Sequence, residues 1–465
     1  MSHVTQETLR FPPVEGLTVR AEFDGGALSS DFGPLVLRGV DRQLGLTAQL
    51  ADAMTDRRHP AYLTHSLRAL FAQRIYQIGC AYEDGNDANA LRRDPLFKLG
   101  LDRKPLDPDQ DLASAPTLCR LENAVTRKDL YRMGEVFVDQ FLGRYATPPE
   151  SIVLDLDHSE DPTHGQQELA FYHGYYEHHC YLPLFIFEGL SGQLVLAALR
   201  PGQSPTGADN AAILKRVLKR LRAAWPETHI LLRGDSAFAS PELMALTRDD
   251  PHLDFLFGLA GNAALTPRAR PHLDATRHFH EQRSALARYH HQTPPEATRT
   301  YHEIDYAAKT WPAPFRVVLK AEVMALGENP RFVVTSLTQP EPEDLYRGIY
   351  APRGQDENFI KALKNDLGSG RTSAHGFLAN QLRLFFAGAA YVLHQALRTE
   401  VLAHTELARA QPATVILKLF KIAVRVEQYK DRIKLHLPSH CPVKTLLHRI
   451  TEILFQIDRP AWNTC

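Results

Sequence analysis

The stretch YAPRGQDENFIKALK, residues 350–364, places a phenol, two cations and a carboxylate at helical spacing. The residues are Tyr350, Arg353, Glu357 and Lys364, and side chains three, four and seven positions apart share one face of a helix. An acid between two cations can be an ordinary ion pair. A metal-binding acid beside phosphate-binding cations is, however, the combination that phosphodiester chemistry on DNA needs. This second interpretation predicts further acidic metal ligands elsewhere in the chain.

One candidate pair of acids lies on a predicted strand. Residues 151–156 (SIVLDL) form a β-rich run that continues into Asp157. Alternation along a strand puts Asp155 and Asp157 on one face. Two acids on one face of a core strand are costly unless they bind a cation or face solvent. The ordinary alternative is a strand end capped by aspartate.

A further acid follows a later strand. Residues 229–232 (HILL) lead directly into Arg233, and Asp235 comes two positions after it. Asp235 could bind metal, or it could cap the helix that follows. Arg233 could hold that acid or a phosphate.

The elements that must position these acids have a regular order from residue 151. We predict three strands, a helix, a strand, a helix and a strand, at residues 151–156, 182–190, 194–199, 211–225, 229–232, 241–247 and 255–259. In a ribonuclease H-like domain this order places the first and fourth strands side by side, so that their acids converge with an acid from a later helix. Three carboxylates can hold two divalent ions roughly 3.5–4 Å apart, and oxygen ligands suit Mg²⁺ or Mn²⁺. After residue 261 the order breaks, and alternating runs such as 287–292 and 315–326 predict a β-rich insertion.

With these acids and the four-residue motif identified, the chain resembles the bacterial insertion-sequence transposases with a DDE active site. It resembles in particular the group defined by Tyr-x2-Arg-x3-Glu-x6-Lys, and the four positions are matched by Tyr350, Arg353, Glu357 and Lys364. In that family the first acid is followed at the second position by Thr or Ser, which fits Asp157 and Ser159. The second acid closes a strand, which fits Asp235. Pro352 suits the first turn of a helix, so the motif helix is expected to begin there, after Tyr350.

The resemblance covers about residues 20–440 and implies a cut-and-paste transposase. Such an enzyme binds the inverted-repeat ends of an insertion sequence in double-stranded DNA, cleaves them and transfers the 3′ ends into target DNA. Asp157, Asp235 and Glu357 are then the catalytic acids that hold two Mg²⁺ or Mn²⁺ ions, with Asp155 as the competitor of Asp157 and with Arg233 as an additional site residue. Tyr350, Arg353 and Lys364 are the expected phosphate-binding residues. A homodimer in a synaptic complex, in the bacterial cytoplasm at the nucleoid, is expected.

The predicted fold class is α/β, with a ribonuclease H-like core and a β-rich insertion between mostly helical N-terminal and helical-and-hairpin C-terminal regions. The expected regions are 1–148 (helical, DNA-end binding), 149–261 (first part of the core), 262–345 (insertion), 346–405 (second part of the core, with the Glu-bearing helix) and 406–465 (basic). Overall composition is ordinary for a globular protein, with 44% hydrophobic residues and a net charge of -1. No run of 18 apolar residues occurs, so no membrane span is expected.

Other interpretations remain open at the level of the sequence. The chain could be a two-metal DNA nuclease of the same fold, or a non-catalytic DNA-binding protein derived from a transposase. The histidines of residues 158–179 could form a zinc site or lie at the surface. The basic helix at residues 211–225 could follow a DNA backbone or simply face solvent.

Overall fold

The computed structural model describes residues 8–455, which divide into two compact units. We call residues 1–130, 362–371 and 385–465 the terminal unit, and residues 131–361 and 372–384 the central unit. Helices α7 (Arg127–Leu142) and α13 (Phe377–Ala396) contain residues of both units. No helix within residues 8–455 is long and apolar enough to cross a membrane.

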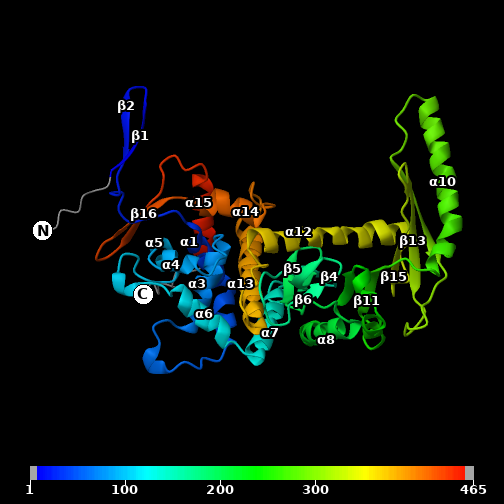
Figure 1. Cartoon of the computed structure of the whole chain (residues 1–465), viewed down its shortest axis with the longest axis horizontal. Helices are drawn as coiled ribbons and strands as arrows, with labels where there is room; N and C mark the ends of the chain where they lie inside the picture. Colours follow the sequence, from blue (N-terminus) through cyan, green and yellow to red (C-terminus); the bar gives the residue numbers. More distant parts are fainter. Residues whose placement is uncertain (1–7, 456–465) are drawn as a thin grey trace, which may run out of the picture. The chain divides into compact units, whose positions relative to one another are not determined.

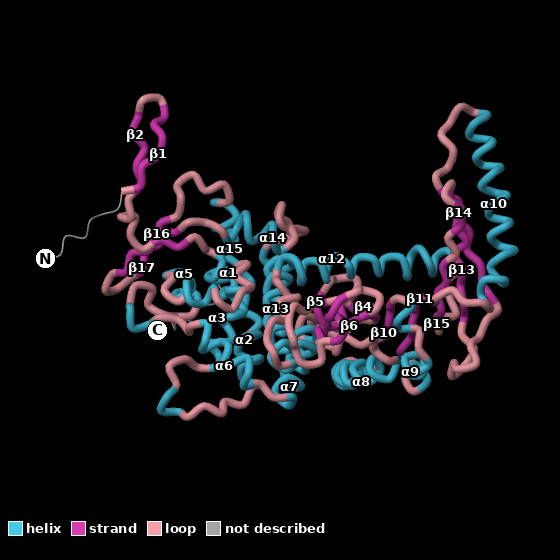
Figure 2. The backbone as a smooth tube through the Cα atoms, viewed as in Figure 1, coloured by secondary structure: helices cyan, strands magenta, loops and turns pink. Residues whose placement is uncertain are grey.

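The central unit is built on a mixed sheet whose main path runs β12-β13-β15-β11-β10-β4-β8-β9, drawn as magenta tube in Figure 2. Its first five strands in the sequence are β4 (Ser151–His158), β8 (Leu184–Glu188), β9 (Gln193–Ala198), β10 (His229–Gly234) and β11 (Leu253–Leu259). Strands β4, β10 and β11 are parallel, whereas β8 and β9 are antiparallel to their neighbours. All five predicted strands are confirmed, and β4 and β10 are neighbours as expected. This mixed sheet is consistent with a ribonuclease H-like fold.

Helix α8 (Gly207–Ala224) supplies much of the core on one face of this sheet. It begins with a capping box, in which the side chains of Thr206 and Asp209 accept each other's backbone N–H groups. Leu214, Val217 and Leu221 follow at helical spacing and belong to the same buried cluster as the inward-facing residues of β4 and β10. Complete burial of one such side chain contributes about 1.5–3 kcal/mol. The predicted helices are confirmed here and at α9 (Pro241–Met244), which continues as a short 3₁₀ turn, η4 (Ala245–Arg248).

A second buried cluster contains the side chains on the opposite face of β10 and β11. Leu231, Leu256 and Leu345 belong to it, and Val153 and Tyr350 pack against it. Because side chains alternate along a strand, Asp155 and Asp157 share the face of Val153. The acids of β4 therefore lie on the face that packs against the segment carrying the four-residue motif.

The insertion continues the central sheet. It consists of α10 (Leu265–Tyr289), β12 (Ala297–Ile304), β13 (Arg316–Met324), β14 (Gly327–Glu328) and β15 (Arg331–Thr335). Strand β15 pairs antiparallel with β11 and with β13, and β13 pairs with β12. Helix α10 lies along β12 and β13, as Figure 1 shows.

The prediction of a strand at residues 287–292 is wrong, because these residues end helix α10 and form the turn after it. Leu265, Ala269, Leu273 and Thr276 are buried at spacings of four, four and three, which is helical periodicity. The residues between them are mostly exposed, so the apolar stripe is thin. The β-rich part of the insertion begins only at residue 297.

The motif lies in a helical segment that begins earlier than predicted. The segment comprises α11 (Pro342–Asp344), a π-helical turn η5 (Leu345–Tyr350), a 3₁₀ turn η6 (Ala351–Gln355) and α12 (Asp356–Lys361). Tyr350 is therefore inside the helical segment, and the expected start at Pro352 is wrong. Proline lacks an N–H group and crowds the carbonyl four residues earlier. The wide turn before Pro352 and the tight turn that contains it accommodate the ring.

The terminal unit is mostly helical in its N-terminal part, where its helices are α1 (Gly33–Leu44), α2 (Leu46–Asp52), α3 (Leu67–Gly79), α4 (Asp87–Leu91), α5 (Pro95–Gly100) and α6 (Ala115–Ala124). A hairpin of β1 (Leu9–Val14) and β2 (Leu17–Ala21) precedes them. In the C-terminal part, the predicted hairpin is confirmed as β16 (Val424–Gln428) and β17 (Ile433–His436), joined by β3 (Leu28–Ser29). Helix α15 (Lys444–Phe455) follows this hairpin.

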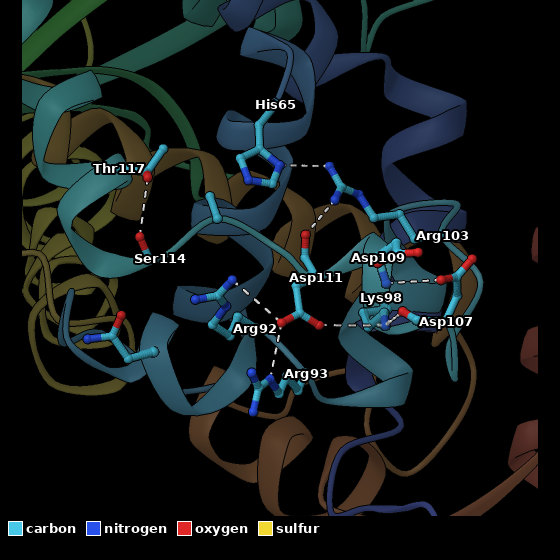
Figure 3. Close-up of polar contacts among 12 residues, drawn as sticks. His65, Arg92, Arg93, Lys98, Arg103, Asp107, Asp109, Asp111, Ser114 and Thr117 are labelled. Atoms are coloured by element: carbon cyan, nitrogen blue, oxygen red, sulfur yellow. Dashed lines mark hydrogen bonds and ion pairs between the residues drawn. The ribbon is translucent and has the colours of Figure 1, made fainter. Parts of the chain in front are cut away.

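A polar network around Asp111 holds the loop before α6 (Figure 3). The Asp111 carboxylate accepts from Arg93 Nε at 3.1 Å and lies 3.5 Å from Arg92 Nη2. Arg103 donates to the Asp111 carbonyl oxygen at 2.6 Å and contacts His65 Nδ1 at 2.9 Å. Burial, reinforced by the nearby arginines, lowers the pKa of His65 to about 4, so the neutral ring accepts from Arg103.

Candidate active site

Asp157 and Asp235 lie at the same edge of the central sheet. In the parallel pair of β4 and β10, Asp155 is opposite Arg233 and Leu156 is opposite Gly234. Asp157 and Asp235 are the next residues along the two chains. The carboxylates are close enough for the charge of Asp235 to raise the pKa of Asp157.

The environment of Asp157 disfavours its charged form. Burial raises the pKa of Asp157 to about 6, with Asp235 adding to the rise and the Arg353 guanidinium opposing it. Arg353 Nη1 lies 3.7 Å from Asp157 Oδ2, and the Asp157 side chain remains 23% exposed. A partly buried acid beside a like charge is stabilised by any cation that binds to it.

The position of Asp235 is compatible with both roles that the sequence suggested for it, capping a helical turn and binding metal. Its Oδ1 accepts the backbone N–H of Ala237 at 2.9 Å, which caps the 3₁₀ turn η3 (Ser236–Phe238). The cap uses one of the two carboxylate oxygens. Asp235 is half-exposed, so capping and metal binding are compatible.

His158 packs between elements at this edge of the sheet. Its ring stacks on Phe238 with a centroid distance of 4.8 Å and an interplanar angle of 1°, and its Nε2 lies 3.2 Å from Asn210 Oδ1. Burial lowers the pKa of His158 to about 4. The neutral ring thus joins β4, α8 and the turn after β10, which is a packing role.

Asp155 and Arg233 form a buried ion pair beneath the site. Both Asp155 oxygens accept from Arg233, whose Nε and Nη2 lie 2.5 Å from Oδ1 and Oδ2. The two side chains are 0% and 2% exposed. Arg233 Nη1 also donates to the carbonyl oxygen of Ile349, in the motif segment. Arg233 therefore fastens β4, β10 and the motif segment to one another.

Asp356 is a buried acid that the pattern of the sequence did not single out. It is fully buried, and both carboxylate oxygens lie away from any hydrogen-bond donor. Burial raises its pKa strongly, and the charge of Asp155 raises it further. Asp356 is therefore protonated at neutral pH and can donate to Asp155.

Tyr350 and Arg353 approach the acids from the motif segment. A Cβ atom at Gly258 of β11 would lie 2.6 Å from the Tyr350 hydroxyl and 2.9 Å from the amide nitrogen of Ser236. The phenol therefore depends on a glycine in β11 for its position. Burial raises the pKa of Tyr350, Arg353 opposes this rise, and Asp235 adds to it.

Glu357 is placed differently from the two strand acids. Its side chain is 70% exposed, and its Oε1 lies 2.7 Å from Lys361 Nζ, a hydrogen bond that lowers the pKa of Glu357. Among the residues that the structure describes, no three His, Cys, Asp or Glu side chains are grouped to hold a metal ion. Asp157, Asp235, Tyr350 and Arg353 thus lie together, whereas Glu357 stands apart from the two strand acids. Lys364 is half-buried in η7 (Ala362–Asp366) of the terminal unit.

The basic face of α8 is partly engaged within the central unit. Arg220 pairs with Asp139 at 2.5 Å, and Arg222 pairs with Asp250 at 2.6 Å. Arg222 also donates to the backbone carbonyls of Thr228 and His252. These two cations therefore have structural partners, while Lys215 and Lys219 are exposed.

Comparisons with known proteins extend over almost the whole chain. A family model described as "Transposase DDE domain group 1" matches residues 11–459. Among solved structures, the cryo-EM structure of the piggyBac transposase synaptic complex with hairpin DNA aligns at 10% sequence identity. That alignment has a TM-score of 0.44 and covers 93% of this chain and 83% of the other chain. No curated protein matches the chain.

Proposed function

The chain belongs to the transposase DDE domain group 1 family, a family of enzymes that cleave DNA and transfer its strands, and from this premise we propose that it is the transposase of an insertion sequence. It binds the inverted-repeat ends of the element, cleaves them by two-metal-ion phosphodiester hydrolysis and transfers the 3′ ends into target DNA. The observation that carries the proposal is the pair Asp157 and Asp235 at one sheet edge, beside Arg353.

The two strand acids fit a divalent cation. Their oxygen atoms are the ligand type that Mg²⁺ and Mn²⁺ prefer, and the raised pKa of Asp157 means that a bound cation would relieve an unfavourable charge. We assign Asp157, Asp235 and Glu357 to two such ions. When bound, the ions activate the attacking water or 3′-hydroxyl and stabilise the leaving oxygen. Glu357 must leave Lys361 to take part, and an exposed ion pair of this kind is weak.

The motif cations and phenol are assigned to DNA phosphates. Arg353 is half-buried, and its 3.7 Å contact with Asp157 is an ion pair longer than a hydrogen bond. A phosphate oxygen can therefore accept from this guanidinium with Asp157 still nearby. The neutral Tyr350 hydroxyl is assigned as a second hydrogen-bond donor to phosphate. Lys364 is the third phosphate-binding residue of the proposal.

The N-terminal helical region is assigned to binding of the transposon ends. Its Arg93 pairs with Asp111 at 3.1 Å through Nε, and the Arg93 side chain is 81% exposed. An exposed guanidinium of this kind can donate to a phosphate oxygen. Two copies of the chain, one for each end, would form the synaptic complex.

The test is metal-dependent cleavage of DNA that carries the sequences flanking the reading frame. We expect the wild-type protein to nick this DNA at the ends with Mg²⁺ and to join the ends to a target plasmid. Asp157→Asn, Asp235→Asn and Glu357→Gln should each lose cleavage by at least about 10²-fold and keep their affinity for the ends. Asp249→Asn, which changes an exposed acid of the same unit, is the matched control and should cleave normally.

Each other result has a distinct meaning. Full cleavage by any of the three variants contradicts the assignment of that acid. Cleavage without joining to the plasmid makes the chain a two-metal nuclease. Binding of the ends with no metal-dependent cleavage makes it a DNA-binding protein.

A further inference from the structure

The insertion forms a polar cleft of about 470 Å³ that is separate from the paired strand acids. Four cations and two tyrosines line it, namely Arg283, Arg299, Lys320, Arg347, Tyr301 and Tyr346. They come from α10, from the adjacent strands β12 and β13, and from the helical segment before Tyr350. All belong to the central unit, so one compact body builds the cleft.

The cleft has an excess of positive charge. Burial alone would raise the pKa of Glu322, but hydrogen bonds from Lys320 and Arg299, at 2.9 and 2.5 Å, lower it to about 2. This acid is 4% exposed and shared by the two cations. Arg347 pairs with Glu343 at 2.7 Å, with both side chains exposed. Four cations therefore meet two acids, and one of those acids, Glu322 of β13, is buried.

Packed aromatic rings lead from the cleft to the candidate active site. The ring centroids of Tyr301 and Tyr346 are 5.6 Å apart, and those of Tyr346 and Tyr350 are 5.3 Å apart. The ammonium group of Lys320 lies 5.7 Å from the centre of the Tyr346 ring. Tyr350 in turn lies close enough to Arg353 and Asp235 for their charges to shift its pKa. A polymer bound along these rings would pass from the cleft to the acids.

We propose that this cleft binds the sugar–phosphate backbone of the DNA strand whose phosphodiester reacts at Asp157 and Asp235. The inference rests on the proposed function and extends it to the insertion. Cations on the phosphates and aromatic rings on the sugars or bases hold a strand without reading its sequence. The row of rings that ends at the acids is the reason to assign a nucleic-acid strand and not an acidic peptide to this cleft.

The salt dependence of DNA binding tests the assignment. Arg283 and Arg347 are the cations to change, because both are exposed and neither is bonded to the buried Glu322. The binding constant of a duplex carrying the transposon end is measured between about 50 and 200 mM salt, with EDTA present to prevent cleavage. The double variant Arg283→Ala/Arg347→Ala should lower the slope of log affinity against log salt by about 2, because each lost phosphate contact removes about 0.9. At fixed salt its affinity should fall about tenfold or more.

Arg288→Ala is the matched control, since Arg288 is also exposed on α10 but does not line the cleft. Its salt slope should stay at the wild-type value. The same series on a duplex of unrelated sequence distinguishes the source of the strand. A loss of slope on the end duplex alone assigns the cleft to the transposon end, and a loss on both duplexes assigns it to any DNA, target included.

An unchanged slope for the double variant on both duplexes overturns the inference. Wild-type cleavage of the ends with Mg²⁺ is measured in parallel, because it tests the proposed function independently. If the wild type cleaves and the slope does not change, only the cleft assignment fails. If the slope changes and no cleavage occurs, the cleft binds DNA and the proposed function fails.

Discussion

Replacing Arg233 by alanine should destabilise the central unit severely. Arg233 and Asp155 are buried to 2% and 0% exposure, and the guanidinium makes two 2.5 Å contacts with the carboxylate. The same guanidinium donates to the Ile349 carbonyl. The substitution therefore leaves a buried carboxylate without its cation and a carbonyl without its donor.

The size of the effect follows from these two losses. Breaking a buried ion pair by removing one partner costs about 3–5 kcal/mol, and an unsatisfied buried carbonyl adds on the order of 1 kcal/mol. Asp155 can escape part of this cost by taking up a proton, since burial without a cation raises the pKa of an acid. A folded-state pKa above the unfolded value means that stability is present at low pH and is lost as the pH rises. The destabilisation should therefore be larger at pH 8 than at pH 5.

Urea unfolding followed by tryptophan fluorescence measures this change where it occurs. Trp225 and Trp311 belong to the central unit, and a Trp462→Phe background removes the third tryptophan, which lies outside the described residues. We expect Arg233→Ala to lose about 3–5 kcal/mol of the free energy of unfolding at pH 8. The double variant Asp155→Leu/Arg233→Met, which removes both charges, should regain most of it, because buried pairs can be replaced by apolar residues at little cost.

Arg347→Ala provides the comparison, because the Arg347 side chain is 68% exposed, and it should change the free energy of unfolding by less than about 0.5 kcal/mol. The reasoning is refuted if Arg233→Ala costs less than about 1 kcal/mol at pH 8 with an unchanged dependence on urea. It is also refuted if the double variant is no more stable than the single one.

Three further predictions concern the residues around the acids. Without divalent metal, Asp157→Asn should raise the free energy of unfolding by about 1–3 kcal/mol above pH 6 and have little effect below pH 4. The reason is that a folded-state pKa of about 6 makes ionisation of Asp157 destabilising as the pH rises between these values. Urea unfolding across this pH range checks the prediction. Lys361→Ala should lower the Mg²⁺ concentration for half-maximal cleavage by about twofold, because it releases Glu357 from an exposed ion pair. Gly258→Ala should slow cleavage at least about tenfold, because its Cβ displaces the Tyr350 hydroxyl; single-turnover cleavage rates measure both effects.

Each of these predictions has a control or a contradicting result. A stability gain for Asp157→Asn that is the same at pH 4 and pH 8 would point to packing and not to charge. A higher Mg²⁺ requirement in Lys361→Ala would mean that Lys361 supports metal binding. Gly348→Ala adds a methyl group where no atom lies within 4 Å, so it should leave the cleavage rate unchanged.

The sequence predicted the sheet edge well because strands have a short period and clear boundaries. The β-rich runs around Asp157 and before Asp235 predicted the two strands, and the ribonuclease H-like order of elements placed them side by side, where the structure pairs them in parallel. The sequence did not reveal that Asp155 is neutralised by Arg233. That contact joins residues 78 positions apart, and it depends on the register of two strands, which alternation alone does not determine.

Three features of the insertion and motif could not be predicted from the pattern of the sequence. Helix α10 has a thin apolar stripe, so its long exposed face hid the helical period. The helical segment runs through Pro352 because the turn before this proline is wide and the turn that contains it is tight, and intrinsic propensity gives no sign of such a change. Asp356 adjoins Glu357 in the sequence, and only the packing of α12 decides which of the two acids is buried.

The pairing of β15 with β11 determines where this chain can change in length. Strand β15 ends at Thr335, opposite Leu256 of β11, and the motif segment begins soon afterwards at Pro342. One residue gained or lost within β15 would turn its apolar side chains to the opposite face and displace Tyr350 from Gly258. Residues 305–315, between β12 and β13, carry no such register. A foreign domain is therefore best spliced in at the exposed residues 309–310, because Trp311 and Phe315 farther along the loop pack against the core, and length added at 309–310 is not transmitted to the acids.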